Sequence, residues 1–154
     1  MLTAEEIHEI KEEFHLYPYK QAACIEALKV VQKHRRWVSD ENVKDLAELL
    51  EMSADEIDSV ATFYNLIYRR PVGKYVILLC DSVSCYIMGL ETVLQHLERT
   101  LGIKYGETTA DDRFTMLPVP CLGTCDHAPA MIVGKDLYRD LTPEKIDEIL
   151  NSYK

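Results

Sequence analysis

Apolar stripes at helical spacing run through the first 70 residues and predict four helices. Thr3 and Ser53 each begin a capping box, in which a hydroxyl and a glutamate three residues later satisfy free backbone amides of a helix start. Another helix is expected near 21–34. A further helix starts near Ser39, and its apolar residues recur at i, i+3, i+4 and i+7. We expect these helices to form a small bundle.

The pattern changes after Gly73, where short apolar runs alternate with turns. A continuous run with β-branched members, 75–79, is typical of a strand that is buried on both faces. Gly102 ends the helix that follows, at a position that favours a left-handed backbone. The predicted order is β-α-β-β-β-α, with strands at 75–79, 114–119, 130–133 and 137–139 and helices at 90–101 and after Thr142-Pro143.

A proline and a glycine in quick succession, Pro71 and Gly73, mark the domain boundary. We therefore predict a helical N-terminal bundle in residues 1–70 and a second domain in residues 71–154. Mixed strands and helices of this kind define an α/β layer arrangement.

Length and charge restrict the function classes. The chain has 154 residues and a net charge of −9, so it lacks the basic footprint of a nucleic-acid binder. No stretch resembles an export signal, and none reaches the length of apolar sequence that spans a bilayer. We expect a cytoplasmic chain with no direct membrane insertion, in a compartment where disulfides are uncommon.

Four of the five cysteines lie in two pairs that follow predicted strands. Cys80 ends the first strand and Cys85 lies in the loop before the next helix, whereas Cys121 and Cys125 lie between the second and third strands. If the two strands are neighbours, all four thiols converge at one edge of the sheet. Four thiolates suit zinc or an iron–sulfur cluster. Cys24, on a helix, is expected to be a buried inert thiol.

Spacing alone leaves both metals open. Structural zinc favours tight knuckles, and the pairs here are C-x4-C and C-x3-C. A [2Fe–2S] cluster takes two cysteines on each iron and tolerates such looser loops, which favours it modestly. Gly89 and Gly123 also let the backbone curl so that amides point at the sulfurs.

Two other types of redox site fit less well. His127, two residues after Cys125, suggests a Rieske centre, but that centre needs two histidines and no second one lies near the pairs. We expect the remaining histidines to be structural or solvated. A thiol–disulfide oxidoreductase needs a C-x-x-C, which neither pair provides.

Several motifs carry a family resemblance along most of the chain. They are VATFY at 60–64, PVGKY at 71–75, the C-x4-C, GETT at 106–109, CLGTCDHAPAM at 121–131 and LTPEKI at 141–146. The chain resembles the thioredoxin-like [2Fe–2S] subunits of NADH:quinone oxidoreductase, respiratory complex I, called NuoE in bacteria. Departures are small: this chain has Met88-Gly89 where the family often has two glycines, and Thr124 where it often has alanine.

The resemblance implies a helical N-terminal region that is followed in the sequence by a thioredoxin-like ferredoxin domain. It implies that Cys80, Cys85, Cys121 and Cys125 hold one [2Fe–2S] cluster, and that the chain is an electron-transfer subunit with no substrate site of its own. The partner would be an FMN- and NADH-binding subunit (NuoF-like), at the cytoplasmic face of the inner membrane. The equivalent subunit of a soluble NAD-linked hydrogenase or formate dehydrogenase is the alternative, and a zinc-stapled interaction module is a third interpretation.

Aromatic residues of the helical region can serve a core or an interface. We expect Trp37, Phe63 and Tyr64 to belong to the core, because apolar stripes on helices usually pack. Tyrosines outside the stripes are candidates for partner contact, namely Tyr17, Tyr19 and Tyr68.

Overall fold

The computed structural model describes residues 1–153, which form two compact units. One unit runs from Met1 to Pro71, and the other begins at Val72. Each unit has its own buried apolar cluster. None of the described helices is long and apolar enough to cross a bilayer.

The first unit is helical, as predicted. Side chains of Thr3, Ser39 and Ser53 cap its helices, and each forms the reciprocal capping box with the residue three positions later. The helix expected from residue 21 begins instead with a 3-10 turn. The elements are α1 (Ala4–Glu13), η1 (Phe14–Leu16), η2 (Lys20–Ala23), α2 (Cys24–Arg35), α3 (Asp40–Leu50) and α4 (Ala54–Phe63).

An apolar cluster from all four helices fills the helical unit. Fully buried members include Ile10, Leu28, Leu46 and Ile57. Cys24 is buried among them, and burial raises the pKa of its thiol to about 11. The structure confirms that this thiol is buried, as predicted, and its inertness stays a prediction.

The expectation that Phe63 and Tyr64 belong to the core is wrong. Phe63 is 80% exposed and Tyr64 is 43% exposed. The reason is that α4 ends at Phe63, and its buried face carries Ile57 and Ala61. Phe63 lies six residues after Ile57, which is off that face for a helix of 3.6 residues per turn.

The second unit is a four-stranded sheet with helices. Its elements are β1 (Tyr75–Cys80), α5 (Val83–Ile87), α6 (Leu90–Leu101), β2 (Phe114–Val119), η3 (Cys125–His127), β3 (Met131–Val133), β4 (Asp136–Tyr138) and α7 (Pro143–Ser152). The strand order is β2-β1-β3-β4. β1 pairs parallel with β2 and antiparallel with β3, and β3 forms a hairpin with β4.

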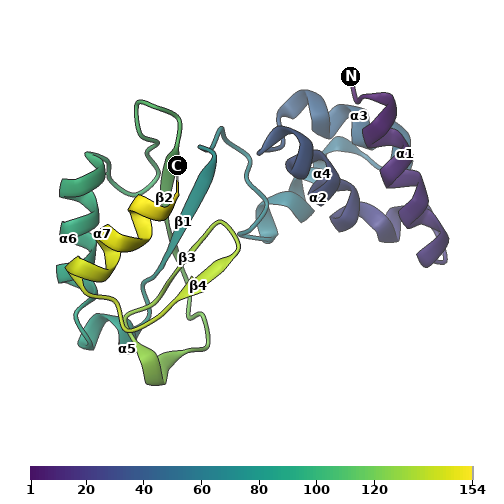
Figure 1. The fold of residues 1–154 in the computed structure, drawn as a ribbon. Coiled ribbons are helices and arrows are strands. Elements are labelled where there is room, and N and C mark those ends of the chain that lie inside the picture. Colours follow the sequence, from purple (N-terminus) through teal and green to yellow (C-terminus); the bar gives the residue numbers. More distant parts are fainter. Residues whose placement is uncertain (154) are drawn as a thin grey trace. The chain divides into compact units, whose positions relative to one another are not determined.

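Helices α6 and α7 lie side by side against the sheet (Figure 1). Between them and the strands lies the core of this unit, which includes Ile77, Leu79, Phe114, Met116 and Ile146. Along β1 every residue after Tyr75 is buried, as the continuous apolar run predicts. The unit has the predicted β-α-β-β-β-α order, with the last two strands shifted by about one residue.

Helix α5 is the main departure from the sequence prediction. The segment expected to be a loop forms a short helix, so Cys85 lies on a helix. Figure 1 shows α5 and the turn that includes η3 at the same end of the sheet. The cysteine-bearing segments therefore share one end of the domain.

Candidate metal centre

Parallel pairing of β1 with β2 brings the two cysteine loops together. Cys80 lies opposite Val119, the last residue of β2, and Cys121 follows two positions later. Backbone bonds fix the strand ends: the Asp81 amide donates to the carbonyl of Val119 over 3.0 Å, and the Cys80 amide donates to that of Ala130 over 3.1 Å. The sequence predicts that the four thiols converge if the two strands are neighbours. β1 and β2 are neighbours, so this condition is met.

The four sulfurs form two close pairs, one buried and one exposed. Cys80 and Cys85 are each 2% exposed, and each of the two sulfurs shifts the pKa of the other thiol. Cys121 and Cys125 are exposed, and their sulfurs lie 3.2 Å apart. Electrostatic interactions also connect the pairs: the sulfur of Cys80 acts on both Cys121 and Cys125.

This grouping favours two metal ions over one. Among residues 1–153, no three cysteine sulfurs lie within 4.8 Å of one another. A tetrahedral zinc site with Zn–S bonds of about 2.3 Å would bring every pair of sulfurs to roughly 3.8 Å. In a binuclear cluster each iron takes its own pair, and the two pairs stand further apart. The chain's sulfur arrangement fits a [2Fe–2S] cluster better than a single zinc ion.

Within each pair, one thiol ionises more easily than its partner. Burial raises the pKa of Cys80, but hydrogen bonds from Ser82 and from the Leu122 amide outweigh burial, so the pKa lies below its usual range. Burial and the neighbouring Cys80 raise the pKa of Cys85 to about 11. The same division holds in the exposed pair, where the Gly123 amide lowers the pKa of Cys121 and the Cys121 sulfur raises that of Cys125. Metal binding requires all four as thiolates and so releases protons.

Backbone amides also point at the sulfurs. The Gly123 amide donates to Sγ of Cys121 over 3.3 Å, in a loop where Gly123 has a φ of 78°. The Leu122 amide donates to Cys80 and the Ala130 amide to Cys85. Such N–H groups stabilise thiolate ligands and help to set a cluster's reduction potential.

Thr124 provides an independent test of fit. Its side chain is 9% exposed, and its Oγ1 is buried without a hydrogen-bond partner in the described part of the chain. A buried hydroxyl is normally satisfied, so its partner is expected to be a group that the polypeptide does not supply. An inorganic sulfide is an acceptor of that kind.

Other candidate ligands are engaged elsewhere. Nδ1 of His127 lies 3.0 Å from a carboxylate oxygen of Asp140, and its Nε2 lies 3.6 Å from Asp126. In the helical unit, Glu5, Glu9 and His34 form the one group of three potential metal ligands whose ligand atoms all lie within 4.8 Å of one another in the described part of the chain. Glu9 there binds Nζ of Lys33 and Nε2 of His34 at 2.9 and 3.0 Å, which makes this group an ion-pair cluster.

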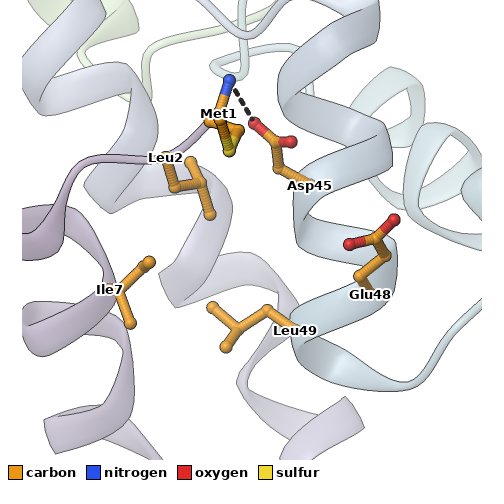
Figure 2. A pocket seen from close by; sticks show the side chains of 6 residues that line it. All are labelled: Met1, Leu2, Ile7, Asp45, Glu48 and Leu49. Carbon is orange, nitrogen blue, oxygen red and sulfur yellow. Dashed lines mark ion pairs between the residues drawn. The ribbon is translucent and has the colours of Figure 1, made fainter.

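A pocket in the helical unit has no cysteine or histidine ligands for a metal. Figure 2 shows its lining and the ion pair of 3.2 Å between the Met1 amino group and Asp45. The lining residues are Met1, Leu2, Ile7, Asp45, Glu48 and Leu49.

Sequence reasoning missed two hydroxyls at the cysteine site. Ser82 and Ser84 lie between Cys80 and Cys85. Ser82 contacts the Cys80 sulfur, and Ser84 lowers the pKa of Cys125. The segment DSVS between the first two cysteines is the available clue in the sequence. Serines in a loop usually bond to the local turn, so their presence alone does not indicate a role at the sulfurs.

Two cysteine pairs at the adjoining ends of parallel strands, with amides directed at the sulfurs, define an iron–sulfur electron carrier. The chain belongs to the thioredoxin-like [2Fe–2S] ferredoxin family, whose profile matches residues 10–154. Family membership supports one [2Fe–2S] cluster and confirms the resemblance and the thioredoxin-like fold predicted from sequence.

Curated relatives extend the match to almost the whole chain. A protein from Buchnera aphidicola subsp. Acyrthosiphon pisum, named as a subunit of NADH-quinone oxidoreductase, is 49% identical over 99% of this chain and 94% of its own. Proteins of the same name from Escherichia coli K12 and Pseudomonas aeruginosa are 48% and 46% identical, over 99% of this chain and 92% of theirs.

Solved structures agree on the fold. An NAD+-reducing [NiFe]-hydrogenase in its H2-reduced state matches 82% of this chain with a TM-score of 0.70 and 25% identity. Its air-oxidized form matches 86% with a TM-score of 0.69 and 24% identity. In both cases the match spans 22% of the hydrogenase chain, so this fold is one part of a larger polypeptide there.

Proposed function

We propose that this chain is the electron-transfer subunit of an NADH:quinone oxidoreductase, with one [2Fe–2S] cluster held by Cys80, Cys85, Cys121 and Cys125. The carrying observation is the arrangement of the four sulfurs as two pairs at one end of the sheet. Identities of 46 to 49% with proteins named as a subunit of NADH-quinone oxidoreductase support the assignment to that complex.

The polypeptide's work is to hold and tune the cluster. When bound, the cluster supplies a one-electron couple. Cys80 and Cys85 anchor it to the core, while Cys121 and Cys125 lie on the exposed side. The Gly123, Leu122 and Ala130 amides donate to the sulfurs and stabilise their negative charge. No bond of a substrate is made or broken in this chain, which fits a subunit without a substrate site.

The electron partner is an FMN- and NADH-binding subunit (NuoF-like). An exposed apolar face of α5 supports its docking beside the cluster, because exposed apolar patches mark interaction sites. The residues are Val83, Tyr86, Ile87 and Met88, which are 60 to 74% exposed. Residues 71–154 would carry the cluster and residues 1–70 would add contacts to the partner. The complex would hold the chain at the cytoplasmic face of the inner membrane.

A soluble NAD-linked hydrogenase or formate dehydrogenase is the second candidate. The fold match to an NAD+-reducing [NiFe]-hydrogenase favours it. Identity is lower there, 25% against 49% for the oxidoreductase subunits, so we place it second. A zinc-stapled module is disfavoured by the sulfur grouping.

Anaerobic capture of the tagged full chain from its own cells tests this function. We expect FMN and at least two iron atoms per copy of this chain to co-purify, and we expect the captured assembly to oxidise NADH with a quinone acceptor. A captured assembly that contains nickel and takes up hydrogen would replace the first candidate with the second. A chain recovered with iron but without flavin would overturn both.

A further inference from the structure

Ser82 stands at the N-terminus of α5, but its side chain does not cap that helix. It occupies the N-cap position of α5, yet its side chain makes no hydrogen bond to the helix amides. Serine and threonine at this position normally accept such a bond. Every other serine or threonine at the N-cap of a described α-helix does so, namely Thr3, Ser39, Ser53 and Thr142.

The Ser82 hydroxyl faces sulfur. Its Oγ lies 3.4 Å from Sγ of Cys80, and the same hydroxyl also lowers the pKa of Cys121. Those two cysteines belong to different pairs. One hydroxyl therefore reaches both halves of the site. A thiolate that binds metal has no proton to give, so in the loaded site the hydroxyl is the donor.

Ser84, two residues after Ser82 and in the first turn of α5, repeats the arrangement. Ser84 is half-buried, and its hydroxyl favours the thiolate of Cys125, although the neighbouring Cys121 sulfur raises the pKa of that thiol overall. The two serines thus act on three of the four sulfurs, those of Cys80, Cys121 and Cys125. The fourth, Cys85, receives the Ala130 amide.

We propose that Ser82 and Ser84 set the reduction potential of the cluster by donating O–H···S hydrogen bonds to its cysteine ligands. Reduction adds one electron, with no proton and no bond exchanged, so the ligand sulfurs become more negative. Hydrogen bonds to a charged acceptor strengthen with its charge, so the hydroxyls stabilise the reduced form and raise the potential. The proposal rests on the cluster assigned under the proposed function.

Ser82→Ala, Ser84→Ala and the double variant of the reconstituted full chain test this role. Iron and sulfide analysis reports whether the cluster is present, and a dithionite titration followed by EPR reports its midpoint potential. We expect full loading and a lower potential in each single variant. In the double variant the ratio of reduced to oxidised cluster at a fixed potential should fall about tenfold. For a one-electron couple this corresponds to about 59 mV.

Two further variants separate tuning from structure. Ser82→Thr keeps the hydroxyl and should retain the wild-type potential, whereas Ser59→Ala removes an exposed hydroxyl of the helical unit and should change nothing. Loaded alanine variants with unchanged potentials would overturn the proposal and leave the proposed function intact. A wild-type chain that takes up no iron would instead contradict the proposed function. If Ser82→Ala alone fails to take up the cluster, the midpoint potentials of Ser84→Ala and Ser82→Thr test the proposal.

Discussion

The sulfurs of Cys121 and Cys125 lie 3.2 Å apart, across a loop that turns at Gly123. That pair is exposed, whereas Cys80, at the end of β1, and Cys85, on α5, are buried. The site therefore has one pair of cysteines that is open to solvent and one pair that is anchored in the core.

Removal of a ligand should abolish the cluster. Cys85→Ala and Cys121→Ala each leave an iron with one protein sulfur, and we expect the reconstituted variants to lose most of their iron and visible absorbance. Cys24→Ala is the matched control, because Cys24 is a buried thiol of the helical unit. Full iron content in Cys121→Ala, or loss of iron in Cys24→Ala, would contradict the ligand assignment.

A buried ion pair connects α1 to α2. Glu6 is 1% exposed and accepts from Nε and Nη2 of Arg35 over 2.6 and 2.7 Å. This contact, which outweighs the effect of burial, lowers the pKa of Glu6 from 4.5 to about 2. A shift of that size corresponds to about 3 kcal/mol. We expect Glu6→Gln to reduce the free energy of unfolding by about 2 to 3 kcal/mol at pH 7, since Arg35 loses its partner.

The effect should depend on pH in a defined direction. Because folding lowers the pKa of Glu6, its stabilisation is complete above about pH 4.5 and disappears as the pH falls through about 2. The stability difference between wild type and Glu6→Gln should narrow across that window, measured by urea unfolding. Glu56→Gln is the control, since Glu56 occupies the same capping-box position but is exposed, and its lowered pKa comes from Ser53. Equal losses in both variants would rule out a special role for Arg35.

The exposed face of α5 should mediate docking. Ile87 is 74% exposed on the helix that carries Cys85. A charge there should remain solvated in the free chain and be buried in the complex, so Ile87→Glu should weaken binding to the flavin-bearing subunit at least about tenfold. The control is Leu137→Glu, at an exposed apolar position on β4. Titration of the purified partner against both variants measures the difference, and equal affinities would exclude this face from the interface.

Gly73 is required by close packing of the backbone. A Cβ at this position would lie 3.0 Å from the carbonyl carbon of Arg113 and 3.0 Å from the carbonyl oxygen of Asp112. The Gly73 amide also donates to Oγ1 of the buried Thr115 over 2.7 Å. Backbone atoms cannot move aside as a flexible side chain can. Gly73→Ala should therefore lower the free energy of unfolding by about 1 to 3 kcal/mol, measured by thermal and urea unfolding. An unchanged unfolding midpoint would show that the backbone before β1 moves to accommodate the added Cβ.

The sequence alone predicted most of the fold because the decisive features are local. Capping boxes at Thr3 and Ser53 and the β-branched run of β1 depend on neighbouring residues only. α5 was missed because a five-residue helix is too short for a periodic stripe, and its cap residue bonds to sulfur. The exposure of Phe63 depends on where α4 ends, which tertiary packing decides.

The metal site was predictable in position but not in detail. Two cysteine pairs after strands indicated convergence, and the strand pairing brings their loops together. The separation into a buried and an exposed pair, and the donors Ser82 and Ser84, depend on α5. These features depend on the tertiary structure and cannot be predicted from the spacing of the cysteines.

The most direct test of the account is the metal and sulfide content of the anaerobically reconstituted full chain, read together with its EPR spectrum. We expect two iron atoms and two inorganic sulfides per chain, little zinc, and an EPR signal that appears only on reduction by one electron. One zinc per chain, with no reducible visible band and no signal after dithionite, would contradict it.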